Sequence, residues 1–245
     1  MGLISITGLL YHWLSRQVEQ DALAWLNQKR RQISEGASNI VFFTAFSAGP
    51  RYIGKQDLQL TQDDWQAIEI IRPGWFPVNW SCDRVARILL LLALPQDNPD
   101  EYVQRIEQVF NVADVSELVT LYQALPILPF PERFRLRAAE GIRSNMTAVF
   151  NAVALQNPYP AEYFDNIAWN QMVLKALFVG SSLNLIYGLE QRNNSDLSQM
   201  LIDYAREREA ANRSVSRELW ELVGNRGQRG QRVQSRDASP DIGFP

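Results

Sequence analysis

The stretch Asn157–Phe178, NPYPAEYFDNIAWNQMVLKALF, is the most informative part of this sequence about the fold. It begins as a proline-rich turn, and Asp165 then stands where an N-cap residue is expected at the start of a helix. Apolar residues occupy almost every side of that helix, which is typical of a buried helix rather than one lying on a surface. The helix nevertheless contains three amides and a lysine, namely Asn166, Asn170, Gln171 and Lys175.

Helix signals recur on both sides of this stretch, whereas strand signals are few. Thr61 with Asp64, and Asp114 with Glu117, have the spacing of capping boxes. The apolar run Asn39–Ser47 fits a strand as well as a buried helix, and its helical neighbours favour the helix. Short helices joined by tight, often proline-containing loops pack antiparallel on their neighbours. We therefore predict an all-α fold of stacked antiparallel helix pairs, an irregular HEAT-like or α-α superhelical bundle without a fixed sequence repeat.

We expect one helical domain over residues 1–223 and a different kind of segment after it. From Gly224 to Pro245 the chain is rich in Gly, Arg, Gln and Ser and poor in large apolar residues, which predicts a disordered tail. Its arginine-glycine steps resemble tails that contact RNA. The segment is short, however, and has no aromatic residue until Phe244, so a plain solvated tail is the preferred interpretation.

The composition excludes several classes of function. Apolar residues make up 46% of the 245 residues and the net charge is −3, so no basic field invites nucleic acid. The sequence contains one cysteine, Cys82, and one histidine, His12. This excludes a disulfide framework, a thiolate cluster and a multi-histidine metal site, and a catalytic triad would have to use His12 itself. Glycine-rich phosphate loops and the common catalytic motifs are also absent. We predict no metal and no cofactor.

The sequence gives no sign of a membrane span. The N-terminal residues lack a basic region and a clear cleavage site. The most apolar run, Ile88–Leu94, is far shorter than the ~20 residues that a spanning helix needs. We therefore expect a soluble cytoplasmic protein.

Polar residues gather in and before the quoted stretch and form the candidate site. A buried amide without a partner costs about 1–3 kcal/mol, so these groups either have partners or line a wet cleft. The preferred interpretation is structural: Lys175 and an arginine pair with Glu140, Glu162 or Asp165, and the amides tie the turn to the helix. The alternative is a pocket for an anion or a polar metabolite. Its candidate ligand-binding residues are Arg143, Asn145, Asn157, Tyr159, Asp165, Asn170, Gln171 and Lys175.

Two other features have structural interpretations as the first choice. Trp65, Trp75 and Trp80 bracket a Pro/Gly loop and could stack on a ligand, although such tryptophans more often pin a loop to the core. The charged run Asp203–Glu209 (DYARERE) is interpreted as a solvated helix face.

Several long runs of this sequence together resemble the EboA family. They are Arg72–Leu92 (RPGWFPVNWSCDRVARILLLL), Leu125–Asn145, Arg137–Arg192, which contains the quoted stretch, and Met200–Glu209 (MLIDYARERE). The similarity extends from about Phe43 to about Leu222 and leaves the tail outside. EboA-like proteins are encoded in the bacterial Ebo gene cluster, which in cyanobacteria is linked to the pigment scytonemin and to moving its precursor out of the cytoplasm. The resemblance implies this pathway, but it supplies no catalytic residues.

Two functions follow as hypotheses. The first is a non-catalytic protein that binds other Ebo-cluster proteins or a small polar metabolite, which suits the binding surfaces of stacked helices. The second is an enzyme that acts on a polar or phosphorylated metabolite beside Arg143 and Lys175. It would use electrostatic stabilisation and a carboxylate such as Glu140 or Asp165.

Overall fold

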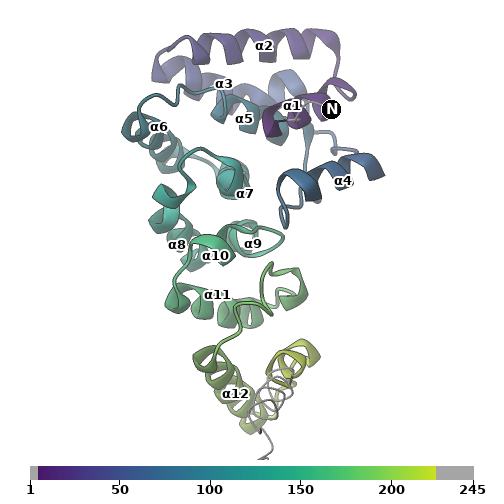
Figure 1. The fold of residues 1–245 in the computed structure, drawn as a ribbon, viewed down its shortest axis with the longest axis vertical. Coiled ribbons are helices and arrows are strands. Elements are labelled where there is room, and N and C mark those ends of the chain that lie inside the picture. The colour runs from purple at the N-terminus through teal and green to yellow at the C-terminus, as the bar shows by residue number, and fades with distance from the viewer. Residues whose placement is uncertain (1–4, 225–245) are drawn as a thin grey trace, which may run out of the picture. The chain divides into compact units, whose positions relative to one another are not determined.

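The computed structural model describes residues 5–224, and this part of the chain is all-α (Figure 1). Within that range no strand forms, and Asp57 and Ser81 make an isolated bridge. The predicted all-α class is therefore confirmed. None of the helices in residues 5–224 has both the length and the apolar character needed to cross a membrane. The predicted tail from 225 to 245 lies outside the described residues, and Gly224 belongs to the last helix.

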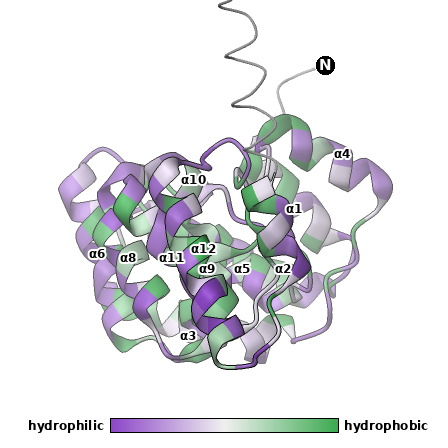
Figure 2. Ribbon diagram, turned by 90° about the horizontal axis from the view of Figure 1, so that it is seen from below, coloured by the Kyte–Doolittle hydropathy of each residue, from purple (hydrophilic) through white to green (hydrophobic). Residues whose placement is uncertain are grey.

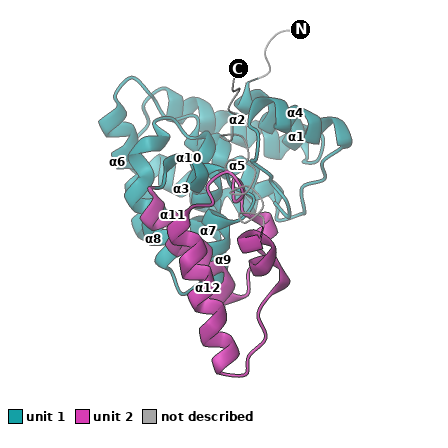
Figure 3. Cartoon of the chain, turned by 60° about the horizontal axis from the view of Figure 1, so that its bottom comes forward, with its two compact units in different colours: residues 1–164 teal, residues 165–245 magenta. Residues whose placement is uncertain are grey.

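The chain divides into two compact units, Met1–Phe164 and Asp165–Pro245 (Figure 3). The division falls inside the stretch Asn157–Phe178, between the proline-rich turn and the helix that follows it. Since this division does not show which parts fold alone, a single domain over residues 1–223 stays a prediction. The HEAT-like character of the helix pairs also stays a prediction.

The first unit contains helices that follow one another through short connections. In chain order they are α1 (Ile6–Ser15), α2 (Gln20–Ser34), α3 (Asn39–Ile53), α4 (Gln62–Ile71), α5 (Cys82–Leu91), α6 (Pro99–Val112), α7 (Val115–Ala124), η1 (Leu125–Ile127), η2 (Pro131–Phe134), α8 (Arg135–Arg143), α9 (Thr147–Ala154) and α10 (Tyr159–Tyr163). The run Asn39–Ser47 lies in α3, so the preference for a helix there is confirmed.

Helix α5 is the centre of the first unit. It packs against α1, α2, α3 and α7, and every residue from Val85 to Leu91 is buried. A helix can bury nearly all its sides only when neighbours surround it, and α5 does so although it carries Asp83, Arg84 and Arg87. Helix α6, in contrast, buries Tyr102, Ile106 and Val109 at helical spacing and carries hydrophilic residues elsewhere (Figure 2). The two patterns match a central helix and a peripheral one.

Capping residues begin α4 and α7 as the sequence predicts. Thr61 and Asp64 form a capping box at α4, and Asp114 and Glu117 form one at α7. Asp64 also accepts a 2.5 Å hydrogen bond from Arg16, which ties the end of α1 to α4. Burial alone would raise the pKa of Asp64, but the hydrogen bonds from Thr61 and Arg16 lower it overall. The predicted boxes are confirmed.

A buried ionic cluster joins three helices of the core. Arg87 lies 3.1 Å from Asp83 and 3.5 Å from Glu117, and its Nε donates to the carbonyl of Phe46 at 3.0 Å. All three charged side chains are less than 10% exposed. Because buried charges need partners, this cluster fixes how α3, α5 and α7 meet. Trp75 and Trp80 are buried as loop pins, and the Trp75 indole donates to the Gln123 carbonyl at 2.9 Å.

The second unit contains α11 (Asn166–Val179), η3 (Leu183–Leu185), α12 (Ser195–Ala210) and a helix at 217–224. Asp165 caps α11 as predicted, and Asn194 is the cap of α12. The prediction that α11 is buried all round is wrong, because Ile167 is 71% exposed and Phe178 is 79% exposed. Its buried side chains are Trp169, Asn170, Met172, Val173 and Ala176.

Candidate ligand-binding site

The predicted site residues divide evenly between the two units. Arg143, Asn145, Asn157 and Tyr159 belong to the first unit, and Asp165, Asn170, Gln171 and Lys175 belong to the second. The cluster as a single site therefore stays a prediction. Arg143 ends α8 and Asn145 lies in the loop after it, and both side chains are exposed.

Asn157 and Tyr159 hold the proline-rich turn to the rest of the first unit. The buried Asn157 amide donates to the carbonyls of Tyr122 at 3.1 Å and Ala152 at 2.9 Å, and its oxygen accepts from the Tyr159 N–H at 2.9 Å. The Tyr159 hydroxyl donates to the Pro131 carbonyl at 2.5 Å, and burial raises its pKa above the ordinary value. These polar atoms bind the backbone of four separate elements, which is the network expected of a structural role.

Two of the three acids that the sequence offers to Lys175, Glu162 and Glu140, have arginine partners. Glu162 receives two hydrogen bonds from Arg72, at 2.7 and 2.6 Å, and Glu140 receives one from Arg137 at 2.8 Å. Lys175 itself is half-buried, and desolvation lowers its pKa.

Two of the amides in α11 have side-chain partners in the segment before α12. Asn170 donates to Asn194 at 3.1 Å, and Asn194 donates back at 2.9 Å. The Asn194 oxygen also accepts from the Leu197 N–H, which caps α12. Asn166 accepts a 3.0 Å hydrogen bond from Arg192. Asp165 caps α11 by accepting from Ala168, and Gln171 is exposed.

Arg192 adds a contact between the same segment and α11. Its guanidinium carbon lies 4.8 Å from the centre of the Trp169 ring, a cation–π distance. Burial lowers the pKa of Arg192, and the nearby Asp165 offsets this in part. Together with the Asn170–Asn194 pair, this contact fixes the start of α12 relative to α11.

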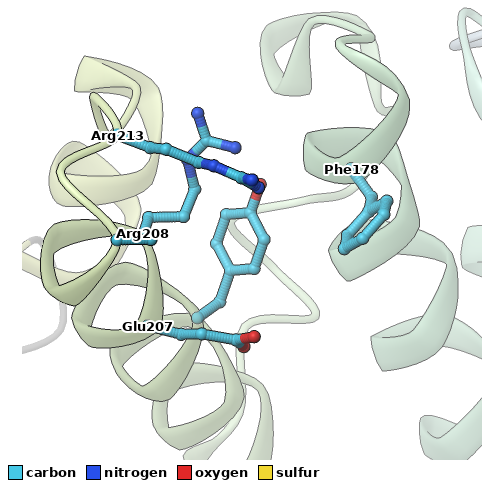
Figure 4. A pocket seen from close by; sticks show the side chains of 6 residues that line it. Phe178, Glu207, Arg208 and Arg213 are labelled. Atoms are coloured by element: carbon cyan, nitrogen blue, oxygen red, sulfur yellow. The ribbon is translucent and has the colours of Figure 1, made fainter.

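A pocket of about 380 Å³ lies between α11 and α12 in the second unit (Figure 4). We call it the α11–α12 pocket. Its lining residues are Phe178, Tyr204, Glu207, Arg208, Ala211 and Arg213. The centres of the Phe178 and Tyr204 rings are 6.3 Å apart, and the ring planes are inclined by 51°. The pocket therefore has an aromatic residue from each of the two helices.

The end of α12 places Arg213 at this pocket. Asn212 has a φ of +51°, the left-handed conformation that asparagine tolerates better than most residues. The Arg213 N–H donates to the Arg208 carbonyl at 2.9 Å, and the Asn212 N–H donates to the Glu209 carbonyl at 2.9 Å. These two bonds form a Schellman motif, which turns the chain back over the helix end.

The charges of the pocket come from two arginines and one glutamate. The Arg208 Nε donates to the Ser214 carbonyl at 2.8 Å, and its guanidinium lies 5.9 Å from the Tyr204 ring centre. Within residues 5–224, the Arg213 guanidinium has no hydrogen bond or ion pair. Glu207 lies on the same helix and also lines the pocket. With two positive charges and one negative charge, the lining has a net charge of +1.

The sequence did not reveal this pocket, because the apolar pattern of α11 predicted a core position for Phe178 and the charges of Asp203–Glu209 predicted a solvated face. Asp203 and Arg206 are indeed exposed, whereas Tyr204 and Arg208 line the pocket. Two signals were present: the one-turn spacing of Tyr204 and Arg208, and an asparagine at a helix end directly before Arg213.

A second aromatic pocket, of about 340 Å³, lies between α2 and α3 in the first unit. There Trp25 and Tyr52 stack directly on each other, with ring centres 4.4 Å apart and planes at 9°. Because each ring already covers a face of the other, less aromatic surface is left for a ligand. Among residues 5–224, no three histidine, cysteine or acidic side chains lie close enough together to hold a metal ion.

Comparison with known proteins identifies a family for this chain. The family model described as metabolite traffic protein EboA matches residues 6–224. No curated protein and no solved structure matched the chain.

Proposed function

This chain belongs to the EboA family, and from this membership we propose that it is a non-catalytic binding component of metabolite traffic. The observation that carries the proposal is the extent of the family match, residues 6–224 of 245, which covers both compact units. The family description names metabolite traffic, and a protein that binds and releases a metabolite fits that description.

The chemistry of the second unit supports a binding role. The α11–α12 pocket combines aromatic side chains with the Arg213 guanidinium, which forms no ion pair with an acid within residues 5–224. Small-molecule sites characteristically combine apolar walls with a few polar groups that set the orientation of the ligand. We place the metabolite in this pocket.

The predicted polar cluster enters the proposal in a narrower form. Apart from Asp165, which is exposed but caps α11, the members whose side chains are exposed or half-buried are Arg143, Asn145, Gln171 and Lys175. A role of these four in contacting a metabolite or a partner is part of the proposal.

The cargo and the setting are also proposed. We propose that the ligand is a precursor of a secondary metabolite, in a pathway of the scytonemin type in cyanobacteria, and that the protein works in the cytoplasm with other Ebo-cluster proteins. The resemblance in the sequence is the support for this step.

The test is co-purification from a host that expresses the whole Ebo cluster, followed by native mass spectrometry. The expected result is a bound small molecule whose mass is absent when the protein is expressed without the cluster. If the protein carries no bound molecule in either preparation, the proposal is contradicted. Turnover of the released molecule by the purified protein would contradict its non-catalytic part.

A further inference from the structure

We propose that the α11–α12 pocket binds a planar aromatic acid with a single negative charge. This rests on the proposed binding function and names the chemical class of the ligand.

The aromatic part of the proposal comes from Phe178. Its side chain is 79% exposed although it follows a run of apolar residues at the end of α11. Figure 4 shows it on the opposite side of the pocket from Arg208 and Arg213. The inclined Phe178 and Tyr204 rings leave ring surface uncovered, and aromatic pairs favour offset or edge-to-face contacts. A planar ring in the pocket would cover this surface.

The acidic part comes from the two arginines. The Arg208 guanidinium is oriented by the hydrogen bond from Nε to the Ser214 carbonyl. The two terminal nitrogens of Arg208 make no hydrogen bond or ion pair within residues 5–224. Arg213 is held at the pocket by the Schellman motif. A guanidinium presents parallel N–H donors that match the two oxygens of a carboxylate.

Glu207 limits the charge and the shape of the ligand. It lines the same pocket and repels a second negative group, so a single carboxylate fits better than a phosphate dianion. A hydroxyl or N–H group on the ring could donate to the Glu207 carboxylate. The ligand class is therefore an aromatic acid with a donor group at the end away from its carboxylate.

The test uses 4-hydroxyphenylacetate as a probe and isothermal titration calorimetry of the full chain. Two matched probes separate the contributions: 4-hydroxyphenylethanol lacks the carboxylate, and butyrate keeps a single carboxylate but lacks the ring. We expect the aromatic acid to bind at least about tenfold more tightly than either. Equal binding of the alcohol would overturn the acidic part, and equal binding of butyrate would overturn the aromatic part. Failure to bind at about 10 mM probe would overturn the whole inference.

Variants then locate the binding. Arg213→Met and Phe178→Ala change exposed side chains, and each should weaken binding of the acid about tenfold. Arg206→Met is the matched control, because Arg206 lies on α12 with an exposed side chain and does not line the pocket. It should bind like the unchanged protein. Circular dichroism melts check that all three variants fold.

The same variants distinguish this inference from the proposed function. If Phe178→Ala and Arg213→Met retain the co-purified metabolite as well as the unchanged protein does, the pocket assignment is wrong while the binding function stands. If the unchanged protein retains no metabolite, the proposed function fails. Binding of 4-hydroxyphenylacetate that is equal in all variants would place the probe elsewhere and overturn the inference.

Discussion

Asn170 in α11 and Asn194 before α12 exchange two hydrogen bonds, at 3.1 and 2.9 Å. Each amide satisfies the other, and the Asn194 oxygen also accepts the Leu197 N–H that begins α12. This pair therefore does two things: it gives a buried amide of a mainly apolar helix its partner, and it positions the helix that carries Tyr204 and Arg208.

Replacement of Asn170 tests the pair. Asn170→Ala removes both hydrogen bonds of the pair and leaves the Asn194 amide only the Arg192 carbonyl as an acceptor, so we expect a loss of about 1–2 kcal/mol in the free energy of unfolding. Asn194→Ala removes the cap as well and should cost about 1 kcal/mol more. Urea unfolding followed by circular dichroism measures both. Gln171→Ala, an exposed position on the same helix, is the control and should change stability little. Equal stability of Asn170→Ala and the control would contradict the pairing.

The local parts of this fold were predictable because their partners are near in the sequence. The capping pairs at Thr61 and Asp64, and at Asp114 and Glu117, involve residues three apart. The cap at Asp165 has the same spacing to Ala168. Such pairs need only one turn of helix to form, so residue type and spacing suffice to find them.

The site was less predictable because its contacts depend on tertiary structure. The partner of Asn170 lies 24 residues away, and that of Glu162, Arg72, lies 90 residues away. The apolar pattern of α11 surrounds the helix and has no preferred face, so it could not show that Phe178 would be exposed. The charged run Asp203–Glu209 also concealed a tyrosine and an arginine that line a pocket.

Gly141 in α8 is required for a close approach of three helices. A Cβ atom there would lie 2.7 Å from the Val153 side chain and 2.8 Å from the Tyr122 ring. We expect Gly141→Ala to reduce the free energy of unfolding by about 1–3 kcal/mol, because the core is closely packed. Gly49→Ala is a matched control in α3, since its Cβ would meet Arg87 at an ordinary 3.4 Å. Thermal unfolding of both variants is the measurement. If the two variants melt at the same temperature, the clash at position 141 is absent.

Arg87 should be among the most sensitive positions of the first unit. Arg87→Met leaves Asp83 and Glu117 buried without a cation, so we expect a loss of about 3–5 kcal/mol. The double variant Arg87→Met with Asp83→Asn removes one of the stranded charges and should recover part of the loss. The exposed pair of Arg31 with Glu35 gives the control, Arg31→Met, which should have little effect. Chemical unfolding of the four proteins decides the matter, and no recovery in the double variant would contradict the assignment.

The turn after α12 provides a test of how Arg213 is positioned. Asn212→Gly keeps a residue that adopts the left-handed conformation easily, so stability and binding of the aromatic acid should be preserved. Asn212→Val introduces a β-branched residue at positive φ and should cost about 1–3 kcal/mol. Calorimetry should show weaker binding in the valine variant even at temperatures where circular dichroism shows it to be folded. Unchanged binding there would mean that the motif does not position Arg213 for the ligand.

The alkaline stability of the protein should depend on Cys82. Burial first, and then the charges of Asp83 and Asp57, raise the pKa of its thiol from 9.0 to about 11. Since the folded-state pKa is the higher one, the thiol contributes stability fully below pH 9 and loses it as the pH rises toward about 11. Melting temperatures of the unchanged protein and of Cys82→Ala, measured from pH 8 to pH 10.5, should therefore converge as the pH rises. The thiol should also resist iodoacetamide at pH 8 until urea unfolds the chain, because only the thiolate reacts. Rapid alkylation of the folded protein, or parallel melting curves for the two proteins, would show that Cys82 titrates as an exposed thiol does.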